Sequence, residues 1–439
     1  MNFQELNIVE PILQALITKE YTDPTPIQIQ AIPLLLAGKD ILGSAQTGTG
    51  KTAAFAIPIL QNLFLKKTNQ YPRLIKALVL APTRELALQI HDNFKEYGKN
   101  VNLRTTVIYG GVPQSRQIKA LSDGVEILIA TPGRLLDLIQ QKKITLANVE
   151  YLVLDEADRM LDMGFIKDVQ KIVSLVPKKR QTMLFSATMP EAILKLANEI
   201  LNQPERVRVA PEEETIDKIK QSLYLVKKAK KMELLVHLLS KKEVKSVLVF
   251  SRTKHGANKI VKGLLAAGTK AEAIHGNKSQ GARQEALFQF KAKNLRVLVA
   301  TDIAARGIDI DELSHVINYD LPDVPETYIH RIGRTGRAGL NGVAISFCSE
   351  EEVNLLKSIE RHIKMTIPIV DDFRFSYGPD NPTKPVVNQA KPKTTNQNPN
   401  AKYPKTFTQK SNKSGKIEPK NYSKHDSRNQ NKNKANNNK

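Results

Sequence analysis

Short apolar runs alternate with longer segments of helical periodicity through the first half of the chain. The runs are rich in Val, Ile and Leu, and the segments between them repeat apolar residues every three or four positions. This alternation predicts βαβ units, and therefore a parallel sheet with helices on both faces. The predicted strands are residues 39–43, 77–80, 105–109, 126–130, 151–154 and 181–185, with helical patterns such as 84–97 and 132–141 between them.

The alternation breaks at residues 208–217, where Pro211 is followed by three glutamates. Such a segment is typical of a solvated linker. We therefore expect two α/β domains, residues 1–207 and 218–370, and the cleft between two such domains is the default ligand site. The second set of predicted strands is residues 246–250, 270–274, 295–299, 315–319 and 342–347.

Residues 371–439 have a different composition, dominated by Lys, Asn, Gln, Pro and Ser. Too few aliphatic side chains are present to offset the entropy of ordering, so we expect a disordered tail. Residues 374–439 carry 15 lysines and arginines against 3 aspartates and glutamates, a net charge of +12 out of +22 for the chain. The tail is either a solubilising extension or a nonspecific tether for a polyanionic partner, most simply nucleic acid, and counterion release favours the tether.

The remaining bulk features restrict the class of protein. The chain has 439 residues and one cysteine, Cys348, which excludes an internal disulfide and fits a reducing cytosol. The N-terminus lacks the pattern of a secretory signal, and no apolar run approaches the length of a transmembrane helix. We expect a cytoplasmic protein without a membrane partner.

A glycine-rich loop lies between a predicted strand and a predicted helix. Glycines let backbone N–H groups approach phosphate oxygens, and the following helix N-terminus favours an anion. Lys51 is expected to reach the β- and γ-phosphates, and the Thr52 hydroxyl to bind Mg²⁺. The alternative, an ordinary strand–helix turn, is disfavoured by the strand and helix on either side. The loop consists of Ala45, Gln46, Thr47, Gly48, Thr49, Gly50, Lys51 and Thr52, with Ala45 where the strict motif has glycine.

Two carboxylates, Asp155 and Glu156, follow the apolar run 151–154. A strand-end carboxylate of this kind holds Mg²⁺ in P-loop ATPases, and its neighbour orients the attacking water. We assign Asp155 to the metal and Glu156 to the general base. The alternative is an acidic strand-to-helix cap at Asp158. Together with the upstream loop, the pair predicts hydrolysis of a nucleoside triphosphate on Mg²⁺.

With these two motifs in place, the chain resembles the DEAD-box ATP-dependent RNA helicases, and the resemblance covers about residues 1–370. The stretch 153–165 further resembles the bacterial RhlE-like subgroup. Glu20 departs from the family pattern, which has glycine before the aromatic residue at position 21. The resemblance implies two tandem RecA-like α/β domains. It is carried by Phe3, Tyr21 with Pro24-Thr25-Pro26-Ile27-Gln28, Pro82-Thr83-Arg84-Glu85-Leu86, Gly110-Gly111, Thr131-Pro132-Gly133-Arg134, Asp155-Glu156-Ala157-Asp158, Ser186-Ala187-Thr188, and residues 249–253, 300–309 and 330–337.

The resemblance also implies roles at the nucleotide site. Tyr21 and Gln28 would bind adenine, since an amide offers the donor and the acceptor that adenine N6 and N7 require. Asp309 would contact the ribose and an arginine. Ser186, Thr188, Asp158 and His330 are the implied coupling residues.

His330, Arg334 and Arg337 are spaced so that a helix would place them on one face. An arginine there would act as an arginine finger on the γ-phosphate. The alternative is a solvated basic helix face, which Gly333 and Gly336 argue against, because glycines weaken a merely structural helix.

A further set of residues is expected to contact RNA. Their hydroxyls, N–H groups and guanidiniums suit phosphates and sugars rather than base edges, although any single one is more often a helix cap. Together they predict a sequence-independent track for a single strand, with 2′-OH contacts distinguishing RNA from DNA. The set is Pro82, Arg84, Gly110, Gly111, Thr131, Gly133 and Arg134 in the first domain, and Gly276, Gln280, Arg283 and Thr301 in the second.

The sequence therefore predicts an ATP-dependent RNA helicase, with ATP and Mg²⁺ as cofactors and RNA as partner. It would couple hydrolysis to local, non-processive unwinding of RNA duplexes or to ribonucleoprotein remodelling, in ribosome assembly or RNA turnover. An ATP-gated RNA clamp or annealing scaffold remains an alternative, and a DNA helicase on the same core is a third. We expect a monomeric core, with protein partners left open.

Overall fold

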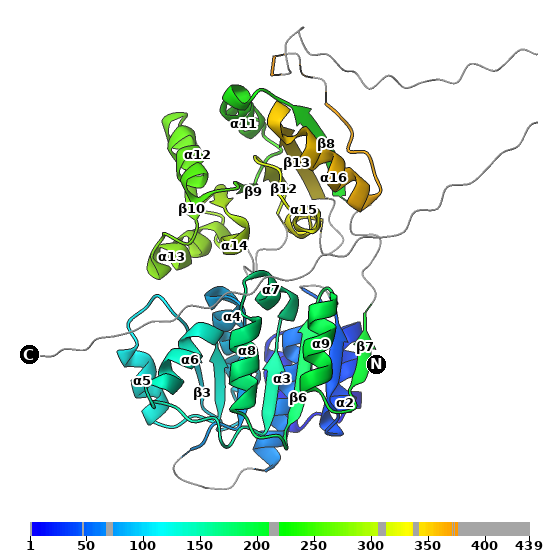
Figure 1. Ribbon diagram of the computed structural model, residues 1–439, viewed down its shortest axis with the longest axis vertical. Helices are drawn as coiled ribbons and strands as arrows, with labels where there is room; N and C mark the ends of the chain where they lie inside the picture. The colour runs from blue at the N-terminus through cyan, green and yellow to red at the C-terminus, as the bar shows by residue number, and fades with distance from the viewer. Residues whose placement is uncertain are drawn as a thin grey trace, which may run out of the picture. The chain divides into compact units, whose positions relative to one another are not determined.

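The computed structural model describes residues 2–45, 48–66, 73–209, 219–305, 313–336, 342–370, 372, 374 and 375. These residues form two α/β lobes, the first ending at residue 209 and the second beginning at residue 219 (Figure 1). No helix in the described ranges is long and apolar enough to cross a membrane.

The first lobe is built on a seven-stranded sheet in which all adjacent strands are parallel, in the order β3-β4-β2-β5-β6-β1-β7. β2 and β5 are neighbours near its centre, so residues that follow these two strands meet at one edge of the sheet. The strands are β1 (Ile41–Ser44), β2 (Ala77–Leu80), β3 (Thr105–Ile108), β4 (Ile127–Ala130), β5 (Tyr151–Leu154), β6 (Gln181–Ser186) and β7 (Glu205–Arg208).

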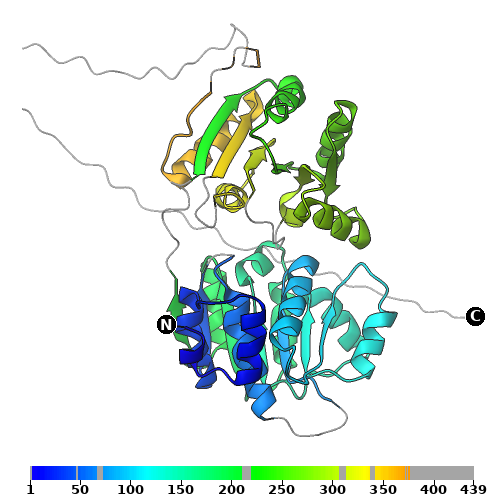
Figure 2. The same ribbon diagram turned by 180° about the vertical axis from the view of Figure 1, so that it is seen from behind.

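Both faces of this sheet are buried, which explains the continuous apolar runs of its central strands. Val79 and Val153 pack toward one helical layer, whereas Leu78 and Leu152 pack toward the other. Figures 1 and 2 show the two layers from opposite sides. The helices on the first face are α1 (Glu10–Thr18), α2 (Pro26–Leu36), α3 (Lys51–Leu65) and α4 (Arg84–Tyr97), and a 3₁₀ turn, Gln4–Leu6, precedes α1. The helices on the second face are α5 (Ser115–Ser122), α6 (Pro132–Gln140), α7 (Ala157–Asp162), α8 (Ile166–Ser174) and α9 (Glu191–Ile200).

The second lobe has a six-stranded sheet in the order β10-β11-β9-β12-β13-β8, and all its adjacent strands are again parallel. Its strands are β8 (Ile219–Leu225), β9 (Val247–Phe250), β10 (Ala271–Ile274), β11 (Val297–Ala300), β12 (His315–Asn318) and β13 (Gly342–Cys348). Its helices are α11 (Lys231–Leu239), α12 (Lys254–Ala266), α13 (Gln280–Lys291), α14 (Asp302–Ala305), α15 (Pro325–Ile332) and α16 (Val353–Ile363), with 3₁₀ turns at Lys228–Lys230 and Glu350–Glu352.

Helices cover both faces of this sheet as well. α11 and α12 pack over Val249 and Val299, whereas α13 and α14 pack over Leu248 and Leu298 on the other face. α15 and α16 close a third apolar cluster over β8 and β13. The two-domain parallel α/β fold predicted from the sequence is confirmed.

The packed part of the second lobe extends beyond residue 370, where the sequence predicts the tail to begin. Leu223 of β8 donates its N–H to Pro368 O at 2.8 Å, and Val370 donates to Leu223 O at 2.8 Å. Phe375 is 4% exposed and its ring lies 5.6 Å from that of His237 in α11. The rest of the predicted tail, residues 376–439, lies outside the described residues.

Candidate active site and RNA-contact segments

The glycine-rich loop lies between β1 and α3, as the sequence predicts. Gly50 is the N-cap of α3 with φ of 90°, a left-handed conformation that favours glycine. Lys51 is buried, and its ammonium donates to Ala45 O at 2.8 Å across the loop. The lysine is therefore held directly over the loop backbone. Gln46 and Thr47 lie outside the described residues.

Gln28 joins the predicted adenine-binding segment to this loop. Its side-chain oxygen accepts from Thr25 N at 3.0 Å, and its Nε2 donates to Gly50 O at 3.1 Å. A Cβ on Gly50 would overlap both Gln28 and Thr25, so glycine is required there on steric grounds as well. The structure thus places Gln28 beside the loop, with both ends of its amide hydrogen-bonded to the backbone.

The aromatic residue expected beside adenine, Tyr21, is 39% exposed and presents its ring at the surface. Its hydroxyl lies 3.3 Å from that of Tyr97, and the two rings are 6.0 Å apart. Glu20 has φ of 59°, so this residue adopts the left-handed conformation that glycine favours. Phe3, the upstream aromatic residue, is buried in the core of the first lobe.

Asp155 follows β5 and its N–H donates to Leu80 O at 3.0 Å. The side chain is buried, and Oδ1 has no hydrogen-bond partner among the described residues. Burial, helped by the neighbouring Glu156 charge, raises the pKa of Asp155 to about 6, although the Lys51 charge acts to lower this pKa. A buried carboxylate oxygen with an unused lone pair suits a hard divalent cation, which prefers oxygen ligands. Asp155 therefore fits the predicted Mg²⁺ role.

Glu156 is buried and has φ of 56°, an uncommon conformation for a residue with a side chain. Strained backbone of this kind concentrates at functional sites. Its carboxylate pairs with Arg159 Nη1 at 2.5 Å, with both side chains less than a tenth exposed. Arg159 was not among the predicted site residues; its spacing of three from Glu156 within a helix is the signal that would have found it.

Three of the four predicted coupling residues come together around Asp158. Thr188 donates to Asp158 Oδ2 from both its backbone N–H (2.9 Å) and its hydroxyl (3.0 Å). The Asp158 N–H in turn donates to Ser186 Oγ at 3.0 Å. Burial alone would raise the pKa of Asp158, but the Thr188 hydrogen bonds and the Lys51 charge together hold it below the ordinary value. The end of β6 is thus tied to α7, the helix that follows Asp155 and Glu156.

The predicted RNA-contact segments of the first lobe lie at strand ends and helix starts. Thr83 caps α4 by accepting from Leu86 N at 3.2 Å, and Thr131 is the N-cap of α6. The Arg84 guanidinium lies against the backbone of Gly111, where a Cβ would overlap it. Gly111 also has φ of 79°. Glycine is therefore needed where this arginine crosses the chain.

The Arg134 side chain is largely buried and hydrogen-bonded within the first lobe. Its side chain is 11% exposed, and it donates to Val112 O (3.2 Å) and to the Gln117 side-chain oxygen (3.2 Å). Gln117, which sequence reasoning missed, also donates to Tyr109 O at 3.1 Å and accepts from Tyr109 N at 3.3 Å. Gln117 therefore fixes both the 110–111 loop and Arg134 through one amide.

In the second lobe the predicted RNA-contact residues cluster at the carboxyl ends of the neighbouring strands β10 and β11. Gly276 is exposed just after β10, and Gln280 and Arg283 lie in the first turn of α13, which Ser279 caps. Thr301 follows β11, and its backbone oxygen accepts from the N–H groups of Ala304 and Ala305, the last two residues of α14. The shared strand edge is the arrangement that a common binding track requires.

One helix prediction is wrong. α15 ends at Ile332, so His330 lies in the helix and Arg334 lies beyond its end, and the two do not share a helical face. Gly333 is the C-cap of α15, and the backbone after it pairs Thr335 with Leu313. Gly333, from which the sequence analysis predicts a functional helix, is the residue at which the helix ends. Arg337 and Asp309 lie outside the described residues.

Arg331, which precedes this C-cap, was not predicted as a site residue. It is 1% exposed and makes a bidentate pair with Asp302, at 2.6 and 2.8 Å. It also donates to Asn318 Oδ1 (3.1 Å) and Asp320 O (2.6 Å), and its guanidinium carbon lies 4.9 Å from the centre of the Phe250 ring. This one side chain joins the carboxyl ends of β9, β11 and β12 to α15.

Comparison with known proteins agrees with this geometry. Residues 25–196 match the family model described as DEAD/DEAH box helicase, and residues 230–339 match the helicase conserved C-terminal domain. The chain is 44% identical over 364 residues to the DEAD-box ATP-dependent RNA helicase CshA of Bacillus subtilis, covering 83% of this chain and 73% of that protein. It is 43% identical over 361 residues to the ATP-dependent RNA helicase CshA of Limosilactobacillus reuteri, covering 82% and 72%.

Among solved structures, S. cerevisiae Dbp5 bound to RNA and ADP BeF3 matches with 34% identity and a TM-score of 0.73, over 84% of this chain and 95% of that one. Its fold agrees with the two lobes described above. The match of both family models, in order, covers the nucleotide loop, the strand-end carboxylates and α15. The chain is a member of the DEAD-box family of ATP-dependent RNA helicases, and thus an RNA-stimulated ATPase.

Proposed function

We propose that this chain couples each ATP hydrolysis to local, non-processive separation of an RNA duplex. The observation that carries the proposal is that a buried Asp155 oxygen without a hydrogen-bond partner among the described residues lies next to Glu156, whose backbone is strained, and near the charge of Lys51. These groups are the parts required for phosphoryl transfer to water. Asp155 and Glu156 follow the central strand β5, and Lys51 begins α3, where its ammonium is hydrogen-bonded to Ala45 O.

The chemistry assigned to the first lobe uses its own residues. Lys51 binds the β- and γ-phosphates, and Thr52 with Asp155 would hold Mg²⁺, which when bound neutralises charge on the phosphate oxygens. Glu156 accepts a proton from water as the water oxygen bonds to the γ-phosphorus and the bond to the ADP oxygen breaks. The Arg159 guanidinium orients the Glu156 carboxylate through their 2.5 Å contact.

The second lobe completes the site in this proposal. Arg334 and Arg337 would meet the γ-phosphate when the lobes close on ATP and RNA, and Asp309 would bind the ribose. His330 would contact the coupling residues around Asp158. The support is that Arg334 follows directly on a helix anchored by the buried Arg331.

RNA would lie along the strand-end residues of both lobes. Arg84 and Gly111 in the first lobe, and Gly276 and Thr301 in the second, offer N–H, hydroxyl and guanidinium groups without base-reading side chains. Such a track binds one strand regardless of sequence. Closure on a bent strand would then exclude its complement.

The test is ATP hydrolysis with and without single-stranded RNA, comparing wild type with Glu156→Gln. Glutamine keeps the shape but cannot accept the proton, so RNA-stimulated turnover should fall by about 10²–10⁴-fold. Glu150→Gln, a half-exposed glutamate just before the same strand, is the matched control and should retain turnover. Wild-type rates in Glu156→Gln would remove the assignment of the base.

A second function, ATP-gated RNA clamping or annealing, is favoured by the +12 charge of residues 374–439. A chain ending at Phe375 keeps the packed aromatic residue and removes the rest of the tail. Strand displacement on short duplexes and annealing of their separated strands should be measured with both chains. If only annealing is lost on truncation, the tail tethers RNA and the lobes unwind it; if full-length protein anneals but never displaces a strand, clamping is the function.

The physiological RNA is proposed only at the level of pathway, either ribosome assembly or RNA turnover, with a monomeric core acting in the cytoplasm. Sequencing RNAs crosslinked to the protein in cells distinguishes the two pathways. The RhlE-like subgroup stays a prediction, because the compared relatives carry the name CshA. Competition between RNA and DNA of matched sequence for ATPase stimulation tests the preference for RNA.

A further inference from the structure

A buried lysine outside every motif discussed so far lies at the start of α11. Lys231 is 2% exposed, and its ammonium donates to Tyr319 O at 2.7 Å and contacts Glu352 Oε2 at 2.7 Å and Asp320 Oδ1 at 3.4 Å. All three hydrogens of the ammonium therefore have acceptors. Two of these acceptors belong to the segment directly after β12, and the third belongs to the 3₁₀ turn after β13.

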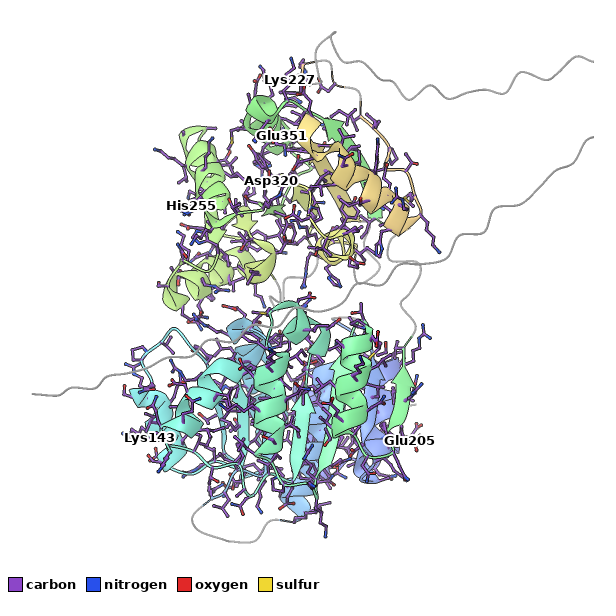
Figure 3. The ribbon with its side chains drawn as sticks, in the orientation of Figure 1. Lys143, Glu205, Lys227, His255, Asp320 and Glu351 are labelled. Atoms are coloured by element: carbon purple, nitrogen blue, oxygen red, sulfur yellow. The ribbon has the colours of Figure 1, made fainter. Side chains whose placement is uncertain are left out.

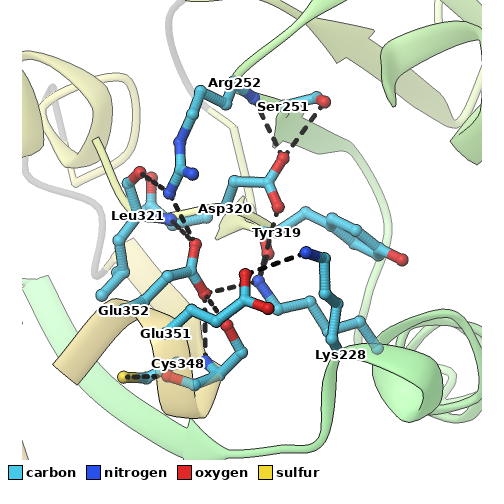
Figure 4. Close-up of polar contacts among 12 residues, drawn as sticks. Lys228, Ser251, Arg252, Tyr319, Asp320, Leu321, Cys348, Glu351 and Glu352 are labelled. Carbon is cyan, nitrogen blue, oxygen red and sulfur yellow. Dashed lines mark hydrogen bonds and ion pairs between the residues drawn. The ribbon is translucent and has the colours of Figure 1, made fainter. Parts of the chain in front are cut away.

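Glu352 is the second member of this cluster and is 4% exposed. Its Oε2 also accepts from the Ser349 backbone N–H (3.0 Å) and hydroxyl (2.8 Å). Its Oε1 accepts from Arg252 Nη2 at 2.8 Å and from Leu321 N at 3.2 Å. One carboxylate thus holds the residues that follow β9, β12 and β13 (Figure 4).

Asp320 completes the cluster. Its Oδ2 accepts from Arg252 N at 3.0 Å and from Ser251 Oγ at 3.3 Å, both directly after β9. Figure 3 labels Asp320 and Glu351 in the second lobe; their side chains are 25% and 71% exposed. The four charged groups Lys231, Arg252, Asp320 and Glu352 are balanced, with two of each sign. We call these four residues the ion cluster.

The ion cluster continues into the helix that leads to Arg334. The backbone carbonyl of Asp320, whose side chain binds Lys231, accepts from Arg331 at 2.6 Å. Arg331 is the last residue but one of α15, and Arg334 follows it three positions later, after the C-cap Gly333. A shift of the segment after β12 would therefore be transmitted to Arg331 and from there to Arg334.

A second Lys–Glu ion pair, close in sequence, forms at the surface, so a lysine and a glutamate can pair here without being buried. Lys228 and Glu351, next to Lys231 and Glu352 in sequence, pair at 2.8 Å with side chains 73% and 71% exposed. Buried ion pairs contribute little net stability compared with apolar packing, because desolvation opposes the Coulomb attraction. The use best supported for such a pair is to fix geometry, and the geometry fixed here is that of three strand ends and α15.

We propose that Lys231 is a positioning residue for RNA-stimulated ATP hydrolysis. It acts through Asp320 and Arg331 to hold the segment that carries Arg334 in the orientation used on cleft closure. The inference rests on the role proposed above for Arg334. It also accounts for the packing of Arg252, whose guanidinium is bound to Glu352 and to Leu321 O (3.2 Å).

The test compares Lys231→Met with Lys228→Met in the full chain. Methionine keeps an unbranched stem of similar volume and removes the charge, and Lys228 supplies the same change at an exposed pair. RNA-saturated kcat of Lys231→Met should fall about 10–100-fold, because small displacements of catalytic groups cost that much. Its KM for ATP should change by less than about 3-fold, because ATP binding is assigned chiefly to the first lobe. Lys228→Met should match wild type in both.

A purely structural role predicts a different outcome. It would lower the melting temperature of Lys231→Met but leave kcat unchanged at a temperature where far-UV circular dichroism shows the variant to be folded, and that result overturns the proposal. Glu352→Gln, which keeps the shape of the partner but removes its charge and replaces one of its two accepting oxygens with a donor, provides a second variant should Lys231→Met not fold. It should show the same loss of kcat with KM for ATP retained.

Two further variants distinguish failure of this inference from failure of the proposed function. If Lys231 acts through Asp320, the double variant Lys231→Met/Asp320→Asn should lose no more kcat than the stronger single variant, whereas independent effects would multiply. Arg334→Lys should lower kcat if the arginine acts on the γ-phosphate. Loss of kcat in Arg334→Lys with none in Lys231→Met contradicts the positioning role alone; wild-type kcat in Arg334→Lys contradicts the arginine-finger assignment itself.

Discussion

Replacing Asp155 with asparagine should stabilise the fold while abolishing catalysis. The carboxylate is buried, and its pKa of about 6 lies above the ordinary value of 3.8. The folded chain therefore holds the proton more tightly than the unfolded chain does. This contribution to stability is complete below pH 3.8 and is lost as the pH rises to about 6, so the ionised carboxylate costs stability at neutral pH.

The magnitude follows from the difference of about two pKa units. At about 1.4 kcal/mol per unit, ionisation of Asp155 costs roughly 3 kcal/mol above pH 6. Asparagine resembles the neutral acid in size and removes that cost. The free energy of unfolding of Asp155→Asn should therefore exceed that of wild type by roughly 3 kcal/mol at pH 8, and by only about half of that at pH 5.

Urea unfolding of the nucleotide-free protein, followed by far-UV circular dichroism at both pH values, measures this difference. Asp92→Asn, at an aspartate whose side chain is 69% exposed, is the control and should shift the unfolding midpoint little. ATP hydrolysis by Asp155→Asn should fall at least about 100-fold, because the carboxylate proposed for the metal is gone. A variant less stable than wild type at pH 8 would refute the reasoning, since it would mean that the buried charge is favourably compensated.

Three further predictions concern residues whose contacts are defined by the structure. Gly50→Ala should weaken ATP binding by about tenfold or more in nucleotide titrations, because φ of 90° is strained for alanine and the new Cβ would overlap Gln28; unchanged affinity would contradict that steric argument. Arg331→Met should lower the free energy of unfolding by about 3–5 kcal/mol in urea, because Asp302 loses a bidentate partner at a buried site; a loss below 1 kcal/mol would show that the pair is not needed. Gln117→Ala should reduce RNA affinity at least about fivefold by fluorescence anisotropy while ATP affinity stays constant, because the loop at residues 110–111, proposed to contact RNA, loses its support; equal loss of both affinities would indicate general unfolding.

The strands of the central sheets could be predicted from the sequence because their signal is local. Residues 77–80 and 151–154 are continuous apolar runs, and both are strands with the predicted bounds. The edge strand β7 was not predicted, since Glu205, Arg206 and Arg208 are exposed and its only buried side chain is Val207. An edge strand lacks the buried second face that gives a central strand its pattern.

The chemical residues were predictable where the chemistry itself dictates the residue type. The positions of Lys51, Asp155 and Glu156 in the fold follow from a loop and a strand end that are close in sequence to their supporting elements. Residues that act by holding others were missed. Lys231 and Glu352 are 121 positions apart, and nothing in their local sequence distinguishes them from the exposed Lys228 and Glu351 beside them.

The end of α15 shows a different reason for failure. The i, i+4, i+7 spacing of His330, Arg334 and Arg337 fits a helix. In the sequence, Gly333 argues against a merely structural helix, because glycine weakens one. Gly333 instead forms the C-cap, because the chain after it pairs with the segment at Leu313. That pairing is a tertiary contact, and local periodicity does not encode it.

The central claim is that catalysis by Asp155 and Glu156 depends on RNA, because the second lobe supplies groups that the first lobe lacks. Steady-state ATP hydrolysis by the full chain, with and without saturating single-stranded RNA, tests the claim most directly. The account predicts that RNA raises kcat by at least about tenfold and that Arg334→Lys removes most of this stimulation. Equal turnover with and without RNA, in a protein that binds both ligands, would contradict it.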